Sequence, residues 1–211
     1  MAIEQTPAGE RAYLDTKDKI LGGMVKGGQL LSEVEVAAQL GISRTPVHEA
    51  FLRLAAEDLL EMLPRRGAVV VPVGPREATD LLEMRLALEG SAVRRLCRSV
   101  DMGPVSAELI ELVERQSEAA GDLARFTELD AAFHGHIVDA AGNLIAQRFY
   151  CSLGDRQRRM MTDAVQADRT LVDRLVVEHR QLAEAIGRRD TESFDALLLR
   201  HLESTYRVVL R

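Results

Sequence analysis

The sequence predicts a mainly α-helical chain, with an N-terminal winged helix-turn-helix that has a small β-hairpin wing and a C-terminal all-α helical bundle. Hydrophobic residues make up 46% of the chain and aromatic residues 4%, a composition that favours packed helices over a β-sandwich. The one β-prone stretch lies early, between about residues 59 and 75, and long helical periodicities follow it to the end of the chain. We therefore expect two domains, residues 1–73 and 76–211.

Charge and cysteine content narrow the classes of function. The formal net charge of −6 argues against indiscriminate binding to nucleic acid or anionic membranes, although specific DNA binding requires only a basic patch. The two cysteines, Cys97 and Cys151, lie far apart without metal-binding or redox spacing. No apolar run has the length of a membrane span, and there is no signal-peptide core, so we expect a cytoplasmic protein that does not contact the membrane.

Three helices are expected before the hairpin. The first spans roughly residues 11–21. The second opens with a capping box formed by Ser32 and Glu35, and it ends at Gly41, which suits a left-handed helix end. The third starts after Ser43, a favourable N-cap residue. Two helices joined by a short glycine-containing turn indicate a helix-turn-helix.

The exposed N-terminal part of the third helix carries the residues expected to contact double-stranded DNA. Its apolar face leaves Arg44, Thr45 and His48 exposed, at the end of a recognition helix that reaches base edges in the major groove. An arginine can read guanine with two hydrogen bonds, and a threonine can contact a phosphate or a thymine methyl group. The predicted DNA contacts also include Arg53, further along the same helix.

The hairpin tip adds a second set of predicted DNA contacts. Arg65 and Arg66 are placed there, and Gly67 would let the backbone approach DNA closely. Each of these residues alone is equally well explained as part of a solvated surface. Their ordered arrangement with the third helix indicates DNA binding.

The C-terminal region carries three histidines and one aspartate on the apolar faces of expected helices. Asp130 and His134 are four residues apart in a helix near residues 122–140, so they share a face, whereas His136 lies elsewhere on the helix. His179 and His201 fall within the apolar stripes of two later helices. A single buried histidine is more often a hydrogen-bonded core residue. Convergence of all four on one divalent transition metal, such as zinc or nickel, would satisfy them together.

The N-terminal half resembles the DNA-binding domain of the GntR family of regulators. The resemblance rests on the run Ser-Arg-Thr-Pro-Val-His-Glu-Ala at residues 43–50 and on Arg-Arg-Gly-Ala-Val-Val at residues 65–70, which resembles the family's wing. The chain departs from the family at His48, where an arginine is usual. This departure leaves Arg44 as the main candidate for base reading.

The C-terminal half resembles the FCD ligand-binding domain of the FadR subfamily of that family. The motifs are Arg85 with Glu89, Asp-Ala-Ala-Phe-His at residues 130–134, Gly-Asn at residues 142–143, Glu-His at residues 178–179 and His201. In metal-binding members of the subfamily, an aspartate and three histidines hold the ion, and small organic acids complete its coordination in some. The resemblance implies that Asp130, His134, His179 and His201 are the metal ligands here.

Two further residues are candidates for effector binding. Arg85 lies on a largely apolar face and would clamp a carboxylate or form an intrahelical pair with Glu89, two readings of equal weight. Asn143 would contact the effector or begin the helix after Gly142, and the second role is favoured.

Together these observations predict a homodimeric transcription repressor that binds a pseudo-palindromic operator and responds to a metal-anchored small carboxylate. One alternative is a regulator in which the metal itself is the signal. A metal-free relative that binds acyl-coenzyme A is disfavoured by the intact ligand set. A metal-dependent hydrolase is also disfavoured, because no general base or activated nucleophile accompanies the ligands, and we expect no enzyme activity.

Overall fold

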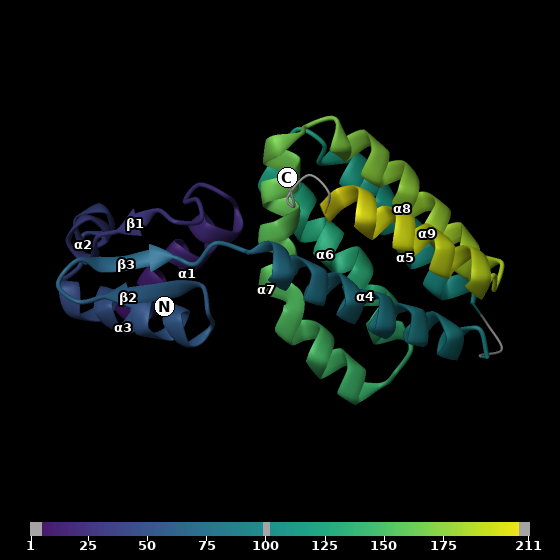
Figure 1. Ribbon diagram of the computed structural model, residues 1–211, viewed down its shortest axis with the longest axis horizontal. Helices are drawn as coiled ribbons and strands as arrows, with labels where there is room; N and C mark the ends of the chain where they lie inside the picture. Colours follow the sequence, from purple (N-terminus) through teal and green to yellow (C-terminus); the bar gives the residue numbers. More distant parts are fainter. Residues whose placement is uncertain (1–5, 99–101, 207–211) are drawn as a thin grey trace, which may run out of the picture. The chain divides into compact units, whose positions relative to one another are not determined.

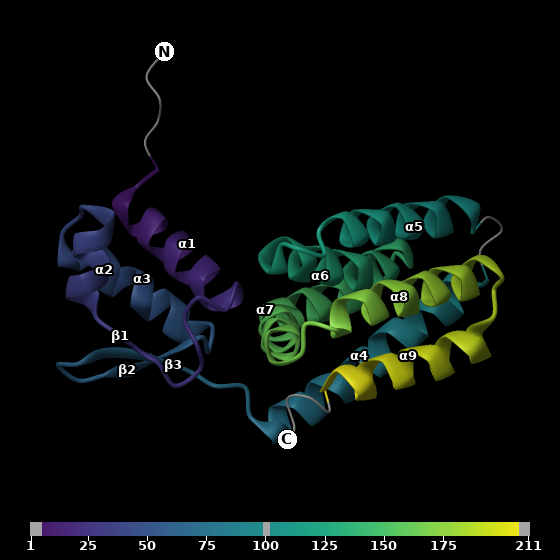
Figure 2. The ribbon, with the colours of Figure 1, turned by 90° about the horizontal axis from the view of Figure 1, so that it is seen from above.

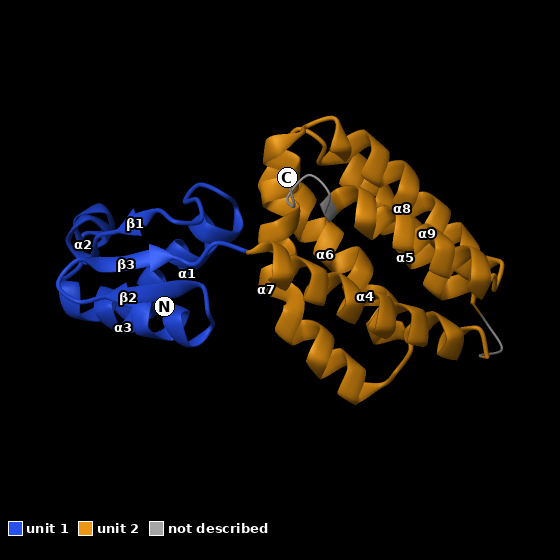
Figure 3. Cartoon of the chain, viewed as in Figure 1, with its two compact units in different colours: residues 1–73 blue, residues 74–211 orange. Residues whose placement is uncertain are grey.

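The computed structural model describes residues 6–98 and 102–206, and the chain divides into two compact units, residues 1–73 and 74–211 (Figure 3). The predicted fold class is confirmed, with helices and a small sheet in the first unit and helices throughout the second. No helix in the described residues is long and apolar enough to cross a membrane.

The first unit is a three-helix domain with a three-stranded antiparallel sheet (Figure 1). The sheet has the order β1-β3-β2, so β3 lies in its centre and hydrogen-bonds to both neighbours. The elements of the unit, in chain order, are α1 (Ala8–Leu21), β1 (Leu30–Leu31), α2 (Glu33–Leu40), α3 (Arg44–Ala56), β2 (Leu60–Leu63) and β3 (Gly67–Val70).

The helix ends follow from local sequence. Ser32 caps α2 by accepting a hydrogen bond from the backbone nitrogen of Glu35 at 3.4 Å, and Gly41 ends it with a φ of 64°. Ser43 stands at the N-cap position of α3, but its side chain makes no capping hydrogen bond. The buried face of α3 packs into the unit's core through Val47, Ala50, Phe51 and Leu54.

Strand β1 was not anticipated, because a two-residue strand has no detectable periodicity. Leu30 pairs with Val69 and Leu31 with Ala68, which ties the segment before α2 to the wing. Gly67 has a φ of 100°, and a Cβ there would overlap the carbonyl oxygen of Leu31. Only glycine fits this crossing of two backbones.

The second unit is a helical bundle (Figure 2). Contacts run from α4 to α9, α9 to α8, α8 to α5, α5 to α6 and α6 to α7, and α4 also packs on α6 and α7. The bundle therefore closes on itself around a shared interior. Its helices among the described residues are α4 (Pro75–Leu96), α5 (Gly103–Glu118), α6 (Leu123–Ala140), α7 (Leu144–Ala167), α8 (Leu171–Gly187) and α9 (Thr191–Tyr206).

Polar side chains occupy the middle of this apolar interior. Phe126, Phe133 and Phe194 are fully buried, as expected for a packed bundle. The bundle also buries charged and polar side chains, each no more than 3% exposed: Arg85, Glu89, Gln116, Asp130, His134, His179 and His201. Buried polar groups are costly unless they are paired, so the contacts among them determine what the bundle can do.

The crossing at Gly67 yields a stability prediction. Gly67→Ala should lower the free energy of unfolding of the first unit by at least about 2 kcal/mol, because the substitution adds a backbone clash to the cost of a positive φ. Gly28→Ala is the matched control, since Gly28 also has a positive φ, 81°, and its Cβ would meet nothing within 4 Å. If the two variants lowered the thermal midpoint of the full chain equally, the result would show that the crossing is not tight.

Candidate metal centre and DNA-binding face

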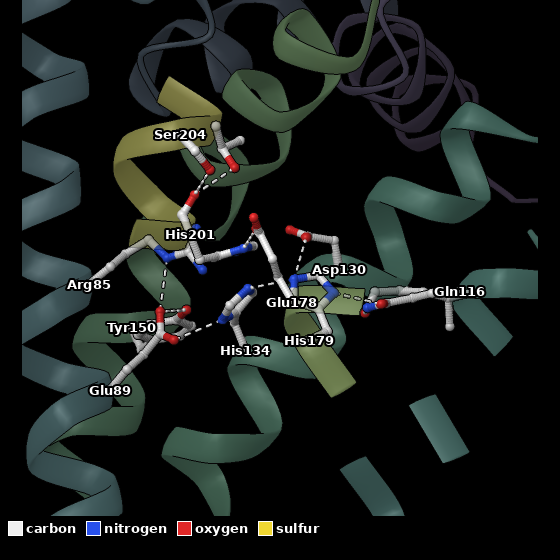
Figure 4. Close-up of polar contacts among 12 residues, drawn as sticks. Arg85, Glu89, Gln116, Asp130, His134, Tyr150, Glu178, His179, His201 and Ser204 are labelled. Carbon is white, nitrogen blue, oxygen red and sulfur yellow. Dashed lines mark hydrogen bonds and ion pairs between the residues drawn. The ribbon is translucent and has the colours of Figure 1, made fainter. Parts of the chain in front are cut away.

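Four predicted ligands come together in the bundle (Figure 4). Helix α6 supplies Asp130 and His134, α8 supplies His179 and α9 supplies His201. One ring nitrogen from each of the three histidines lies within 4.8 Å of those of the other two. The Nε2 atoms of His134 and His179 are 3.2 Å apart, and Oδ1 of Asp130 lies 3.4 Å from Nε2 of His179.

A ring of acceptors outside the cluster holds each imidazole by its other nitrogen. Nδ1 of His134 lies 2.8 Å from Oε2 of Glu89, and Nδ1 of His201 lies 2.8 Å from Oε2 of Glu178. Nδ1 of His179 lies 2.7 Å from Oε1 of Gln116. This is the arrangement in which metal-binding histidines are usually held by a second layer of residues.

These acceptors determine the tautomer of each ring. An ionised carboxylate only accepts hydrogen bonds, so Nδ1 of His134 and of His201 must carry the proton. Gln116 donates its Nε2 to the backbone carbonyl of Leu129 at 3.1 Å, which leaves its Oε1 to accept from His179. In the neutral form of each ring, Nε2 therefore carries the lone pair.

Burial disfavours the charged form of two of these imidazoles, His134 and His179. It lowers the pKa of His134, an effect that the positive charge of Arg85 increases. It lowers the pKa of His179 further, with His201 and His134 adding to the effect. Although burial acts to raise the pKa of Glu89, His134 and Arg85 bring it down to about 2, so this carboxylate is ionised.

The inner atoms of the cluster lack hydrogen-bond donors. Nε2 of His201 and Oδ1 of Asp130 are buried and make no hydrogen bond to any described residue. Two lone pairs 3.2 Å apart, as on His134 and His179, repel each other unless a cation lies between them. Two ligands roughly 2.0–2.1 Å from one ion, at an angle of about 100°, have this spacing. The residues therefore fit a divalent transition metal.

Arg85 makes one of the two contacts predicted for it. Its Nε donates to Oε1 of Glu89 at 2.8 Å, one turn along α4, and the hydroxyl of Tyr150 donates to the same oxygen at 2.7 Å. Burial and the nearby Glu89 raise the pKa of Tyr150 well above 10, so this hydroxyl keeps its proton. Both residues thus hold the carboxylate that orients His134. The clamping of an effector carboxylate by Arg85 stays a prediction.

Asn143 and His136 lie outside this network. Asn143 is exposed, and its side-chain oxygen caps α7 by accepting from the backbone nitrogens of Ile145 and Ala146. The helix-start role favoured for Asn143 is the one that the structure shows, and its contact with an effector stays a prediction. Nε2 of His136 lies 3.0 Å from Oε2 of Glu108, away from the three clustered histidines.

Sequence reasoning missed two residues that hold the cluster, Gln116 and Tyr150. Gln116 had a detectable signal, since it follows Leu109 and Val113 at helical spacing and is therefore a polar residue at a core position. Tyr150 had none, because a tyrosine on an apolar face is an ordinary core residue.

A surface depression of about 370 Å³ between α8 and α9 has Glu178 and His201 in its wall.

In the first unit, most of the predicted DNA contacts line one groove of about 790 Å³ between α3 and the β2–β3 turn. They are Arg44, Thr45, His48, Arg65, Arg66 and Gly67. Arg44 and His48 are well exposed, with 68% and 50% of their side-chain surfaces accessible. The exposed apolar side chains of Val34 and Leu52 also line the groove, which makes it suited to contact thymine methyl groups.

Arg53 is not among the groove residues. Its Nη1 lies 2.7 Å from Oε2 of Glu10, and its guanidinium stacks 3.8 Å from the centre of the Tyr13 ring. These contacts join α3 to α1. Helical spacing could not distinguish this partner from DNA, because the face of α3 that carries Arg53 meets a helix distant in sequence.

The comparisons agree with this architecture. Residues 8–70 match the model of the bacterial regulatory proteins of the gntR family, and residues 80–204 match the FCD domain. The chain belongs to the GntR family, in its FCD-containing, FadR-like branch. It is therefore a transcriptional regulator with a DNA-binding helix-turn-helix, and not an enzyme.

Curated relatives match most of the chain, and a solved structure shares its fold. The probable D-xylose utilization operon transcriptional repressor of Paenarthrobacter nicotinovorans is 32% identical, covering 87% of this chain and 80% of the relative. The gluconate operon transcriptional repressor of Bacillus subtilis (strain 168) is 29% identical, over 72% of this chain and 62% of the relative. The solved structure of E. coli McbR/YncC shares the fold, with a TM-score of 0.77, 24% identity and coverage of 97% and 98% of the two chains.

The cluster yields a paired test. His134→Ala should reduce bound metal from about one ion per chain to near zero and lower the thermal midpoint by several degrees, because it removes one of four ligands. His136→Ala, on the same helix but outside the cluster, should leave both the bound metal and the thermal midpoint unchanged. Full metal occupancy of the His134→Ala protein, measured by elemental analysis after dialysis, would place the site elsewhere.

Proposed function

We propose that this regulator is a homodimeric repressor whose bundle binds a divalent transition metal, zinc or nickel, together with a small organic acid. The observation that carries the proposal is the convergence of three buried histidines and one carboxylate, with one ring nitrogen of each histidine and a carboxylate oxygen close together. The ligands would be Asp130, His134, His179 and His201. A bound divalent cation would supply a positive centre that anchors a carboxylate oxygen.

In this proposal, residues around the ligands orient them toward the metal position. Glu89, Gln116 and Glu178 orient the imidazoles and keep their Nε2 lone pairs available. In the desolvated interior, the attraction between a bound cation and a carboxylate would be strong enough to offset the cost of burying a charged organic acid. The name of the gluconate operon repressor supports including sugar acids among the candidates.

The first unit would bind double-stranded operator DNA through the groove between α3 and the wing. Arg44, Thr45 and His48 would reach base edges and phosphates, with Arg65 and Arg66 contacting the backbone from the wing. A homodimer matches the two-fold symmetry of a pseudo-palindromic operator. The names of relatives as operon repressors support repression as the mode of action. Effector control requires the acid to favour one DNA-binding state over the other, typically by about 1–3 kcal/mol.

The DNA-reading assignment is tested with an arginine variant. Arg44→Ala should abolish preference for the operator over random duplex while leaving the thermal midpoint unchanged, because Arg44 is exposed and contacts bases rather than the core. Lys26→Ala removes one exposed positive charge from the same unit, outside the groove, and should retain the preference. Operator affinity that survives Arg44→Ala at moderate salt would contradict the major-groove role.

The effector assignment is tested by thermal unfolding with a panel of monocarboxylates, dicarboxylates and sugar acids, with and without a chelator. A ligand at about 100 times its dissociation constant adds about 2.7 kcal/mol, enough to raise the midpoint by a few degrees. The expected result is a shift by one acid that disappears with chelator. Destabilisation by chelator with no shift from any acid would indicate that the metal itself is the signal.

A further inference from the structure

A carboxylate lies among the basic groups of the DNA-binding groove. Glu33, in the first turn of α2, places Oε2 3.2 Å from Nη2 of Arg44 and Oε1 2.7 Å from Nδ1 of His48. Its side chain is only 14% exposed, while those of its two partners are 68% and 50% exposed. One partly buried carboxylate thus holds two exposed side chains of the next helix.

The position of this carboxylate is electrostatically unfavourable for DNA binding by itself. DNA affinity depends largely on neutralising phosphates, and a negative charge in the groove opposes that. The hydrogen bond from His48 and the contact with Arg44 lower the pKa of Glu33 despite its partial burial, so it is ionised at neutral pH. An ionised acidic residue here therefore weakens general affinity for DNA. The benefit that offsets this cost must lie in how it positions its partners.

We propose that Glu33 is a positioning residue for operator recognition, which holds the Arg44 guanidinium in the groove and sets the tautomer of His48. The proposal rests on the proposed function of the groove as the DNA-reading surface. It adds a residue of α2, outside the recognition helix, to the determinants of sequence specificity.

The contact with Glu33 leaves Arg44 able to hydrogen-bond to a base. A guanidinium has five N–H donors, and the contact with Glu33 engages Nη2, so other donors are available for a guanine edge. A long side chain held at one end loses less conformational freedom when it meets DNA.

The contact with His48 determines what that residue offers to a base. The ionised Glu33 only accepts, so Nδ1 of His48 carries the proton and, in the neutral ring, Nε2 is the acceptor. In the major groove, the amino groups of adenine and cytosine are the donors that such an acceptor recognises. The base opposite His48 should therefore carry an exocyclic amino group.

The affinity experiment compares two neighbouring carboxylates in the full chain. An operator is first selected from a random duplex library with the wild-type protein, and its affinity and that of an unrelated duplex are then measured for Glu33→Ala and Glu35→Ala. Glu35 lies in the same first turn of α2 but is exposed and does not line the groove. Glu33→Gln serves as a second variant that keeps the size of the side chain.

Glu33→Ala and Glu33→Gln should weaken operator binding about tenfold, the loss expected for a misplaced base contact. Binding of the unrelated duplex should stay the same or tighten, because a negative charge has been removed. Glu35→Ala should not weaken either complex. Unchanged or tighter operator binding by the Glu33 variants would overturn the proposal, and so would equal weakening with both duplexes, which indicates a general structural defect.

A spectroscopic experiment tests the tautomer directly. The chain has five histidines, so the ring nitrogens of ¹⁵N-histidine-labelled protein can be assigned to His48 with His48→Gln as reference. At about pH 8.5, where an ordinary imidazole is neutral, His48 should be protonated at Nδ1 in the wild type. Glu33→Ala should shift it toward protonation at Nε2, and Glu35→Ala should not.

An unchanged His48 tautomer in the Glu33→Ala protein would overturn the proposal that Glu33 sets that tautomer. Failure of the groove as a DNA-reading surface has a different signature, because Arg44→Ala would then also leave operator binding unchanged. If Arg44→Ala abolishes operator preference and Glu33→Ala does not weaken it, only the positioning role fails.

Discussion

The bundle is organised around a cluster of buried polar side chains whose acceptor atoms face one another. His134 and His179 approach each other through unprotonated Nε2 atoms, His201 presents a third lone pair, and Asp130 adds a carboxylate. Every helix from α4 to α9 contributes to the cluster or to the groups that orient it, with Glu89 on α4, Gln116 on α5 and Tyr150 on α7. Apolar packing alone would form a bundle, but it would not place these polar groups at its centre, where each one costs free energy unless it is satisfied.

The two units use the same physical device for different ligands. In the bundle, acceptors bonded to Nδ1 leave each imidazole with Nε2 as the available atom, which is what a metal requires. In the first unit, Glu33 accepts from Nδ1 of His48, and the available atom is again Nε2. In both cases the chemistry that a histidine offers is decided by the residue behind it. Membership of the FCD-containing GntR branch explains why a DNA-binding unit and an FCD domain share one chain.

Local sequence was a sound guide wherever a feature depended on neighbouring residues. The cap at Ser32, the left-handed end at Gly41 and the buried face of α3 were all read from spacings of a few residues. The reading was incomplete where partners are distant. The two-residue strand β1 exists because β3 lies beside it, and Arg53 turns to Glu10 and Tyr13 because α1 covers that part of α3. Neither partner is visible from the segment alone.

The sequence by itself determined the fold class, the family and the residue types available for chemistry, because helical periodicity, capping and the Ser-Arg-Thr-Pro-Val run are local patterns. Only the tertiary structure decided which of those residues meet. Asp130 and His134 are one helical turn apart, but His179 and His201 join them through the packing of α8 and α9. The tautomers of the rings depend on Glu89, Gln116, Glu178 and Glu33, and such hydrogen bonds form between elements that are separated in sequence and adjacent only after folding.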